Sequence, residues 1–168
     1  MSTHVVVNTY AHAVTYVADN MLRSLKQIII ASGLDPARMT REWIILDRGI
    51  GIWLKGQYLD VVTLEIYKPA SKELAGRWDF AIEYGFTADG DEEMWTDTDA
   101  IRFAIKKAGL DPVDCDYRIV VQTKPESPEV EGWGPAELLS TDGFVRRSVG
   151  TTIGANPLAS RAAYWRKS

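Results

Sequence analysis

The chain has 168 residues, of which 46% are hydrophobic, and its 19 basic and 23 acidic residues give a formal net charge of −4. This is enough apolar material for one sizeable core, and one domain is expected at this length. A protein that mainly coats nucleic acid should be basic, so the charge argues against that class. The single cysteine, Cys115, cannot form an internal disulfide. With no apolar run near the roughly 18 residues of a membrane span and no signal-peptide pattern, a cytoplasmic protein is expected.

The charge is unevenly distributed along the chain. Residues 143–168 carry five basic residues and no acidic one, which leaves −9 for residues 1–142. We expect the opposite signs to help the C-terminal segment lie against the rest of the domain. Exposed ion pairs contribute only about 0–1 kcal/mol each, and salt weakens them further.

Two helices are predicted at the start of the chain. Between residues 14 and 29, apolar residues recur at helical spacing and polar residues fill the opposite face. Gly33 followed by Leu34 is typical of a helix stop. A second helix is predicted over residues 35–56, opened by Asp-Pro and ended by glycine.

Strands and one more helix follow. Residues 58–67 and 77–84 alternate with a period of two, which indicates strands with one buried face, and the turn-rich connection between them predicts an antiparallel hairpin. A third helix is predicted over residues 96–109, with Thr96 as its N-cap. Residues 117–123 then read as another strand.

The pattern changes after residue 123. Residues 124–168 hold four prolines and five glycines, and short β-like runs such as residues 144–153 are embedded in them. Irregular segments longer than about 15 residues are uncommon in a compact domain. Several large apolar residues in this segment nevertheless require burial. We therefore expect an ordered strap, residues 124–168, wrapped over a body of residues 1–123.

The strongest catalytic-looking pattern is Asp97-x-Asp99, with an acidic loop at residues 89–93 just before it. Two carboxylates could hold Mg²⁺ or another hard cation. The structural alternative places both aspartates in the first turn of the third helix, where the helix dipole favours negative charge. The capping interpretation is preferred, and the spacing of the acidic loop does not match an EF-hand.

Other reactive residue types are sparse. His4 and His12 are the only histidines and are too isolated for a zinc site or a catalytic triad. Cys115 lies between two aspartates, which raise the pKa of a thiol and disfavour a nucleophile. The glycine-flanked residues 150–154 lack the lysine of a phosphate-binding loop. No catalytic residue, metal site or cofactor is predicted.

The order of the elements resembles the HORMA domain, and local sequence is similar to bacterial HORMA proteins found beside cGAS-like nucleotidyltransferases in anti-phage systems (CBASS). The similar segments are 16–26 (YVADNMLRSLK), 64–67 (LEIY), 95–99 (WTDTD), 104–110 (AIKKAGL) and 140–146 (STDGFVR). None of them is a catalytic motif, so the resemblance rests on their number and order over essentially the whole chain.

The resemblance implies an α+β fold of the HORMA type, with long helices packed on an antiparallel sheet and the strap acting as a safety belt. In that family the belt closes around a closure-motif peptide, which adds a strand to the sheet, and an AAA+ remodeller reopens it. A second HORMA protein is one candidate source of the peptide. Closed bacterial members bind and activate the cGAS-like enzyme, which makes a nucleotide second messenger.

The residues of this chain can be placed on that scheme. A strand at 117–123 just before the strap could offer an unpaired edge to a peptide. The peptide-binding candidates are Tyr117, Ile119, Val121 and Thr123. The candidates for anchoring the strap are Trp133, Phe144, Val149, Ile153 and Trp165.

The sequence therefore predicts a regulatory peptide-binding switch and not an enzyme. Its predicted partners are a closure-motif peptide, a cGAS-like nucleotidyltransferase and an AAA+ ATPase, with no membrane and no nucleic acid. The leading alternative is a small metal-dependent enzyme that uses Asp97 and Asp99. A second alternative is a nucleic-acid-binding module that uses the basic C-terminal segment.

Overall fold

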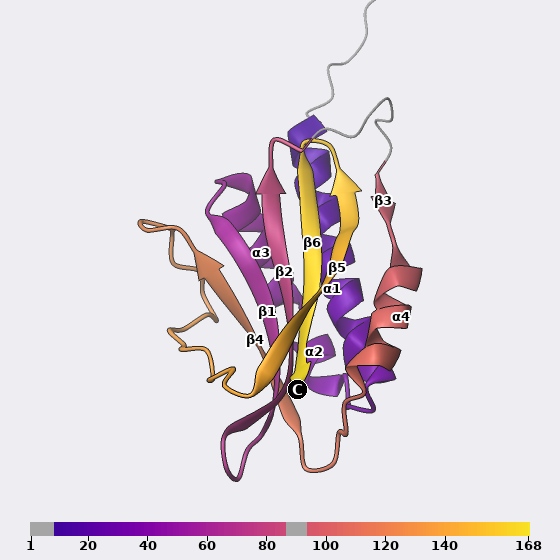
Figure 1. Ribbon diagram of the computed structural model, residues 1–168. Coiled ribbons are helices and arrows are strands. Elements are labelled where there is room, and N and C mark those ends of the chain that lie inside the picture. The colour runs from indigo at the N-terminus through magenta and orange to yellow at the C-terminus, as the bar shows by residue number, and fades with distance from the viewer. Residues whose placement is uncertain (1–8, 87–93) are drawn as a thin grey trace, which may run out of the picture.

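Helices cover one face of a six-stranded antiparallel sheet (Figure 1). The computed structural model describes residues 9–86 and 94–168. The elements in chain order are α1 (Thr9–Ala31), α2 (Ala37–Arg41), α3 (Trp43–Lys55), β1 (Leu59–Lys68), β2 (Glu73–Tyr84), β3 (Trp95–Thr96), α4 (Thr98–Ala108), β4 (Asp116–Thr123), β5 (Phe144–Ala155) and β6 (Leu158–Lys167). The strand order is β3-β5-β6-β2-β1-β4, so β4 is an edge strand at one end of the sheet.

The first helix ends as its sequence predicts. Gly33 adopts a φ of +87°, a left-handed conformation that favours glycine. The N–H of Leu34 then donates to the carbonyl of Ile29 at 2.9 Å, which closes the last turn. The inward face of α1 supplies seven fully buried core residues: Ala13, Val17, Met21, Leu22, Leu25, Ile28 and Ile29.

The second predicted helix is wrong in one respect, because the chain forms two helices there. The turn α2 buries only Met39, and Glu42 separates it from α3 with φ −91° and ψ 3°. This break reorients the chain so that α3 packs its own apolar face on α1 and β1. The buried face of α3 comprises Leu46, Gly49, Ile50, Trp53 and Leu54.

The predicted hairpin of β1 and β2 is confirmed, but the prediction of one buried face fails for β1. Val62, Leu64 and Ile66 point to the helices and are buried, as expected. Thr63 and Glu65, on the opposite face, are also fully buried. The strap crosses that face, so it covers positions that alternation alone assigns to solvent.

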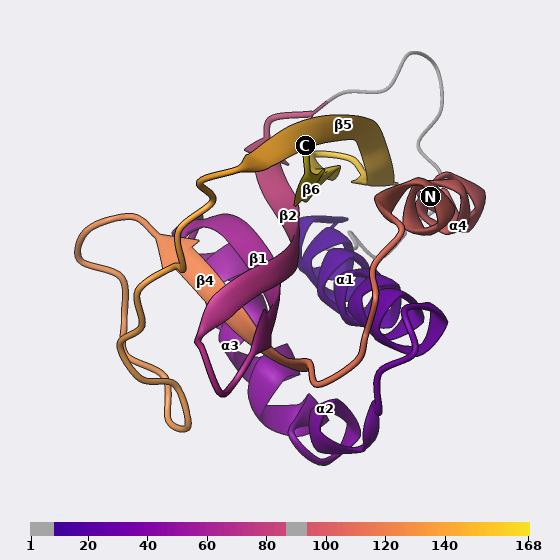
Figure 2. The ribbon, with the colours of Figure 1, turned by 60° about the horizontal axis from the view of Figure 1, so that its bottom comes forward.

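The predicted irregular strap is also wrong over half its length. Only residues 124–143, here named the crossover segment, lack helix and strand, whereas β5 and β6 form a long antiparallel hairpin. This C-terminal hairpin pairs with β2 through β6, in the middle of the sheet. Figure 2 shows the crossover segment looping outward from β4 and returning across the sheet to β5.

The third helix is confirmed with a shifted cap. Asp97, not Thr96, is the N-cap of α4, and its Oδ1 accepts from the N–H of Ala100 at 2.9 Å. Asp99 pairs with Arg102 one turn later, at 2.7 Å. Thr96 is engaged elsewhere, since its hydroxyl lies 2.9 Å from that of Tyr16 on α1.

Candidate peptide groove at the edge of the sheet

The edge strand β4 is paired on one side only. It forms an antiparallel ladder with β1, in which Tyr117, Ile119 and Val121 lie opposite Ile66, Leu64 and Val62. The three predicted peptide-binding residues therefore share the helix-facing side of the sheet. On the opposite side, Arg118 and Val120 face the crossover segment.

The main-chain groups of β4 alternate between β1 and the free edge. The N–H of Tyr117 donates to Asp116 Oδ1 and its carbonyl accepts from Arg38, so neither group is directed at β1. The N–H of Lys124, seven residues on, donates to the carbonyl of Tyr58, just before β1. Because the strand period is two, the N–H and C=O groups of Ile119 and Val121 are directed to the free edge.

A groove lies along this free edge and consists of two hollows that share Ile119. The larger hollow, of about 780 Å³, separates β4 from the crossover segment. Its apolar walls include Trp53 on α3, Val121 on β4, and Val130 and Trp133 on the crossover segment. Val130 and Trp53 are buried, whereas Trp133 is half-buried.

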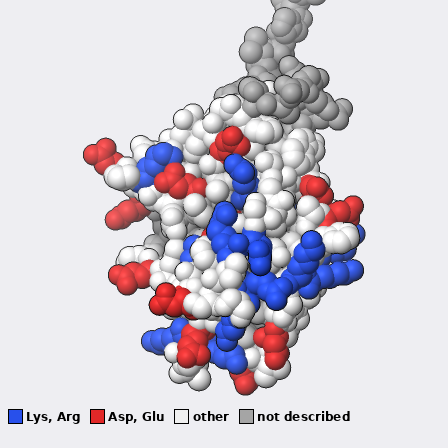
Figure 3. Space-filling view, viewed as in Figure 1, with Lys and Arg blue, Asp and Glu red and all other residues white. Residues whose placement is uncertain are grey.

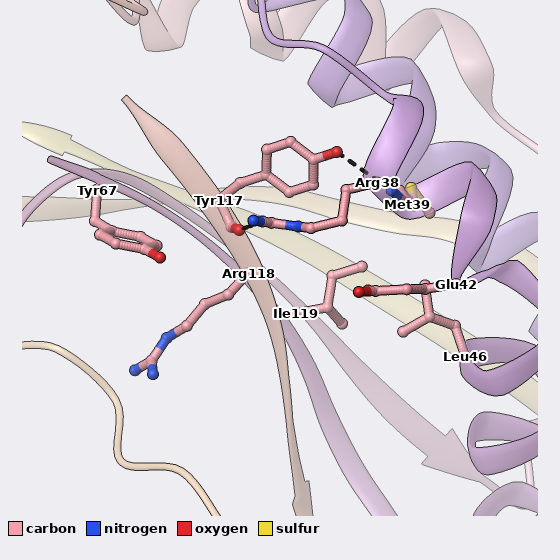
Figure 4. Close-up of a pocket in the computed structure, with 8 residues that line it drawn as sticks. All are labelled: Arg38, Met39, Glu42, Leu46, Tyr67, Tyr117, Arg118 and Ile119. Atoms are coloured by element: carbon pink, nitrogen blue, oxygen red, sulfur yellow. Dashed lines mark hydrogen bonds between the residues drawn. The ribbon is translucent and has the colours of Figure 1, made fainter. Parts of the chain in front are cut away.

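The smaller hollow, of about 300 Å³, lies at the other end of β4 between that strand and α2 (Figure 4). Arg38 lies over the Tyr117 ring, with its guanidinium carbon 4.6 Å from the ring centroid. It also pairs with Asp116 at 3.0 Å. Since these contacts use the Tyr117 main chain, the open part of the β4 edge runs from Ile119 toward Thr123.

Two tryptophans hold the crossover segment against α3. Trp133 packs edge-on against Trp53, with ring centroids 5.1 Å apart, and donates its indole N–H to the carbonyl of Ile45 at 3.1 Å. Trp53 in turn donates to the carbonyl of Pro128 at 2.8 Å. Gly132 makes the preceding turn possible with φ +91°.

A buried carboxylate holds the crossover segment on the other side of β4. Glu65 Oε1 accepts from Arg118 Nε at 2.6 Å, and Oε2 accepts from the main-chain N–H of Leu139 at 2.7 Å. Arg118 also donates to the carbonyl of Glu137. The alternation of residues in β1 assigns Glu65 to solvent, so the sequence does not mark it as a functional residue. The side chain is buried only because the strap returns across that face.

The first residue of the crossover segment is fixed at the surface. Lys124 pairs with Asp60 at 2.7 Å, and its ammonium lies 5.0 Å from the centroid of the Tyr84 ring. The Tyr84 hydroxyl donates to the carbonyl of Leu59, and burial raises the pKa of this tyrosine. The predicted peptide-binding residue Thr123 makes a hydroxyl contact of 2.9 Å with Ser127.

The other predicted strap anchors lie in the C-terminal hairpin, away from the groove. Ile153 is fully buried in the core, and Phe144 and Val149 are half-buried on β5. Trp165 on β6 donates its indole N–H to Asp79 Oδ2 at 2.8 Å. The structure thus brings Trp133 alone of these five residues to the groove.

The residues considered for catalysis are used structurally or lie apart. Among the described residues, no three His, Cys, Asp or Glu side chains group as a metal site, and the predicted acidic loop at 89–93 falls outside them. His12 is exposed on α1, and His4 also lies outside the described residues. Burial is the main cause that raises the pKa of the Cys115 thiol; Lys68 opposes it, and Asp111 and Asp114 add to it. The raised pKa disfavours a nucleophilic thiolate.

The whole chain, residues 1–168, matches the family model for bacterial HORMA domain 2. No curated protein matches the sequence. Solved structures with a similar fold include a chain of a mitotic checkpoint complex, with a TM-score of 0.72 at 12% identity, covering 90% of this chain and 97% of that one. HTP-2 of C. elegans, bound to the HIM-3 closure motif, gives 0.68 at 11% identity, covering 99% and 100%.

A bacterial structure is similar as well. In the HORMA:CdnC:Trip13 complex of E. coli MS115-1, one chain gives a TM-score of 0.60 at 11% identity, with 100% of this chain and 98% of that one covered. The predicted α+β fold of the HORMA type is confirmed. The chain belongs to the bacterial HORMA domain 2 family. None of its described helices has the length and apolar character needed to cross a membrane.

Proposed function

We propose that this protein is a regulatory switch that binds a closure-motif peptide as an added strand on β4 and holds it under the crossover segment. The observation that carries this proposal is the unpaired edge of β4, which faces a hollow of about 780 Å³ bounded by the crossover segment. Main-chain bonds to Ile119, Val121 and Thr123 would supply affinity, and side-chain pockets on both faces would supply specificity.

The strap makes such a complex slow to dissociate. The crossover segment is fastened on one face of the sheet by Trp133 and on the other by Glu65. A peptide strand lying between those fastenings could leave only after the segment opens locally. In this proposal residues 1–123 are the body of a single domain, and residues 124–168 are the safety belt.

The closed, peptide-bound form would bind and activate a cGAS-like nucleotidyltransferase in bacterial anti-phage signalling, and an AAA+ ATPase would reopen it. The family and a similar chain in a complex titled HORMA:CdnC:Trip13 support this assignment. The protein itself would perform no chemistry. The aspartates of the alternative enzyme, Asp97 and Asp99, are a helix cap and an ion-pair partner.

Two proline variants on β4 test the proposal. Val121→Pro removes an N–H that points to the free edge, so we expect peptide binding to fall at least tenfold while the fold is retained. Gln122→Pro is the matched control, because its N–H is directed at β1 and its loss should lower the melting temperature. The ligand is the tightest peptide from a displayed random library panned on the purified protein.

The same variants test the regulatory step. A bacterial cGAS-like nucleotidyltransferase is assayed for nucleotide product alone, with the protein, and with the protein and peptide. We expect product only with the third combination, and its loss with Val121→Pro. Peptides that bind Val121→Pro as well as the unaltered protein, or an enzyme indifferent to the closed protein, would contradict the proposal.

A further inference from the structure

The carboxylates that line the groove are free, whereas its guanidinium groups are neutralised. Glu42 lines the smaller hollow, and Glu129 and Glu131 line the larger one. All three are exposed, and none forms an ion pair with a described residue. Arg38 is paired with Asp116 and Arg118 with Glu65.

The acidic character extends along this side of the molecule. Figure 3 shows mainly Asp and Glu side chains over the side formed by β4 and the crossover segment, with a few Lys or Arg among them, whereas Lys and Arg gather over the middle of the view, where the hairpin lies. Within residues 124–142, five carboxylates stand against a single cation, Lys124, which is itself paired with Asp60. An approaching ligand therefore meets negative potential on this side.

One wall of the groove is apolar. Ile119, Val121, Trp53, Val130 and Trp133 line the larger hollow. Alternate side chains of an added strand point to one face, so a large apolar residue at every second position would reach this wall. Large apolar residues in a water-excluding pocket contribute most of the affinity in such interfaces.

We propose that the ligand of this groove is a cationic peptide, with large apolar residues at alternate central positions and lysine or arginine on both flanks. The inference rests on the proposed function and specifies its ligand. Basic flanks would pair with Glu42 at one end and with Glu129 and Glu131 at the other. An acidic peptide would meet these carboxylates with no free arginine to oppose them. Charge complementarity of this kind acts mainly on the association rate and on partner choice.

The first experiment is the composition of peptides that the protein selects. A random displayed library is panned at low and at physiological salt, and the selected peptides are sequenced. We expect apolar residues at alternate central positions with an excess of Lys and Arg beside them. Peptides that no longer bind to Val121→Pro are those that use the free edge. If such peptides carry neutral or acidic flanks, this inference is overturned and the proposed function stays intact. Failure to select any such peptide would count against the proposed function itself.

The second experiment reverses two charges at the groove. In Glu129→Lys/Glu131→Lys, the association rate of the selected peptide should fall about tenfold at low salt, and its salt dependence should flatten. A version of the peptide with glutamate flanks should bind this variant better than the unaltered protein. The matched control is Glu73→Lys/Glu83→Lys, which changes the net charge equally at two exposed, unpaired carboxylates on β2, outside the groove. Equal losses in both variants would overturn the inference.

Discussion

At the scale of single residues, Glu65 departs furthest from its expected place. Its side chain is fully buried although it stands at a position that strand alternation assigns to solvent. A buried carboxylate is tolerated only when its oxygens are paired. Here one oxygen binds Arg118 on the edge strand and the other binds the main chain of Leu139. The same residue thus ties β1, β4 and the crossover segment together.

We expect Glu65→Ala to lower the free energy of unfolding by about 2–3 kcal/mol, because Arg118 and the Leu139 N–H lose their acceptor. The loss is limited because a third of the Arg118 side chain is exposed and can be hydrated (34%). Urea unfolding measures the stability, and hydrogen exchange at residue 139 measures release of the crossover segment.

The matched control for Glu65 is Asp60→Ala. Asp60 is also on β1 and also pairs with a residue near β4, but the side chains of Asp60 and Lys124 are about half exposed. This substitution should change stability by no more than about 0.5 kcal/mol. If both alanine variants lose the same stability, the buried carboxylate has no special role in holding the crossover segment.

At the scale of elements, the contact between α3 and the crossover segment depends on a glycine. A Cβ built on Gly49 would lie 2.7 Å from Cε2 of the Trp133 ring, too close for the indole to stay in place. Gly51, half a turn away on the same helix, has open space around it. Glycine is a weak helix former at both positions. At Gly49 the absence of a Cβ leaves room for Trp133, whereas nothing in the structure requires glycine at Gly51.

We expect Gly51→Ala to stabilise the protein by up to about 1 kcal/mol, through helix propensity alone. Gly49→Ala should displace Trp133, and so remove its contact with Trp53 and its bond to Ile45. Tryptophan fluorescence and proteolysis of residues 124–143 would report that release, and peptide affinity should fall. An unchanged emission spectrum in Gly49→Ala would show that Trp133 does not depend on this space.

At the scale of the whole molecule, the two parts of the strap are held by different forces. The crossover segment is fastened by a few polar and aromatic contacts. The C-terminal hairpin instead contributes to the core through Ile153, Leu158 and Tyr164 and pairs with β2. The five cations of residues 143–168 form no ion pair with a described carboxylate. No direct ion pair among the described residues therefore supports the expectation that opposite charges help the C-terminal segment lie against the body.

Hydrogen exchange at different ionic strengths tests this division. We expect protection of β6 amides to stay within about twofold between about 0.05 and 0.5 M NaCl, because apolar burial and ladder bonds are hardly screened. Adding the peptide should protect β4 and residues 124–143 and leave β6 unchanged. A hairpin that loses protection steadily with salt would restore the electrostatic explanation.

Local sequence determined most of the elements. The helical spacing of α1, the Gly33 stop and the period of two that marks β1 and β2 as strands are short-range signals, and the structure confirms the elements they predict. The sequence does not predict β6, because several of its residues are alanine. Alanine has low strand propensity and is only weakly hydrophobic, so the alternation of apolar and polar residues is faint. The sequence also predicts the strand at 117–123, which the structure places at the edge of the sheet.

Tertiary structure alone decided how the strap is used. Whether a strand lies at the edge of a sheet depends on which other strands pair with it. The hairpin of β5 and β6 pairs with β2, which is far away in the sequence, so no local pattern predicts this pairing. The burial of Glu65 and the contact of Gly49 with Trp133 arise from the same return of the chain across the sheet. The sequence specifies the charges of residues 1–142 and the apolar residues of the strap, but only the folded chain brings Glu129, Glu131 and Trp133 to the free edge of β4.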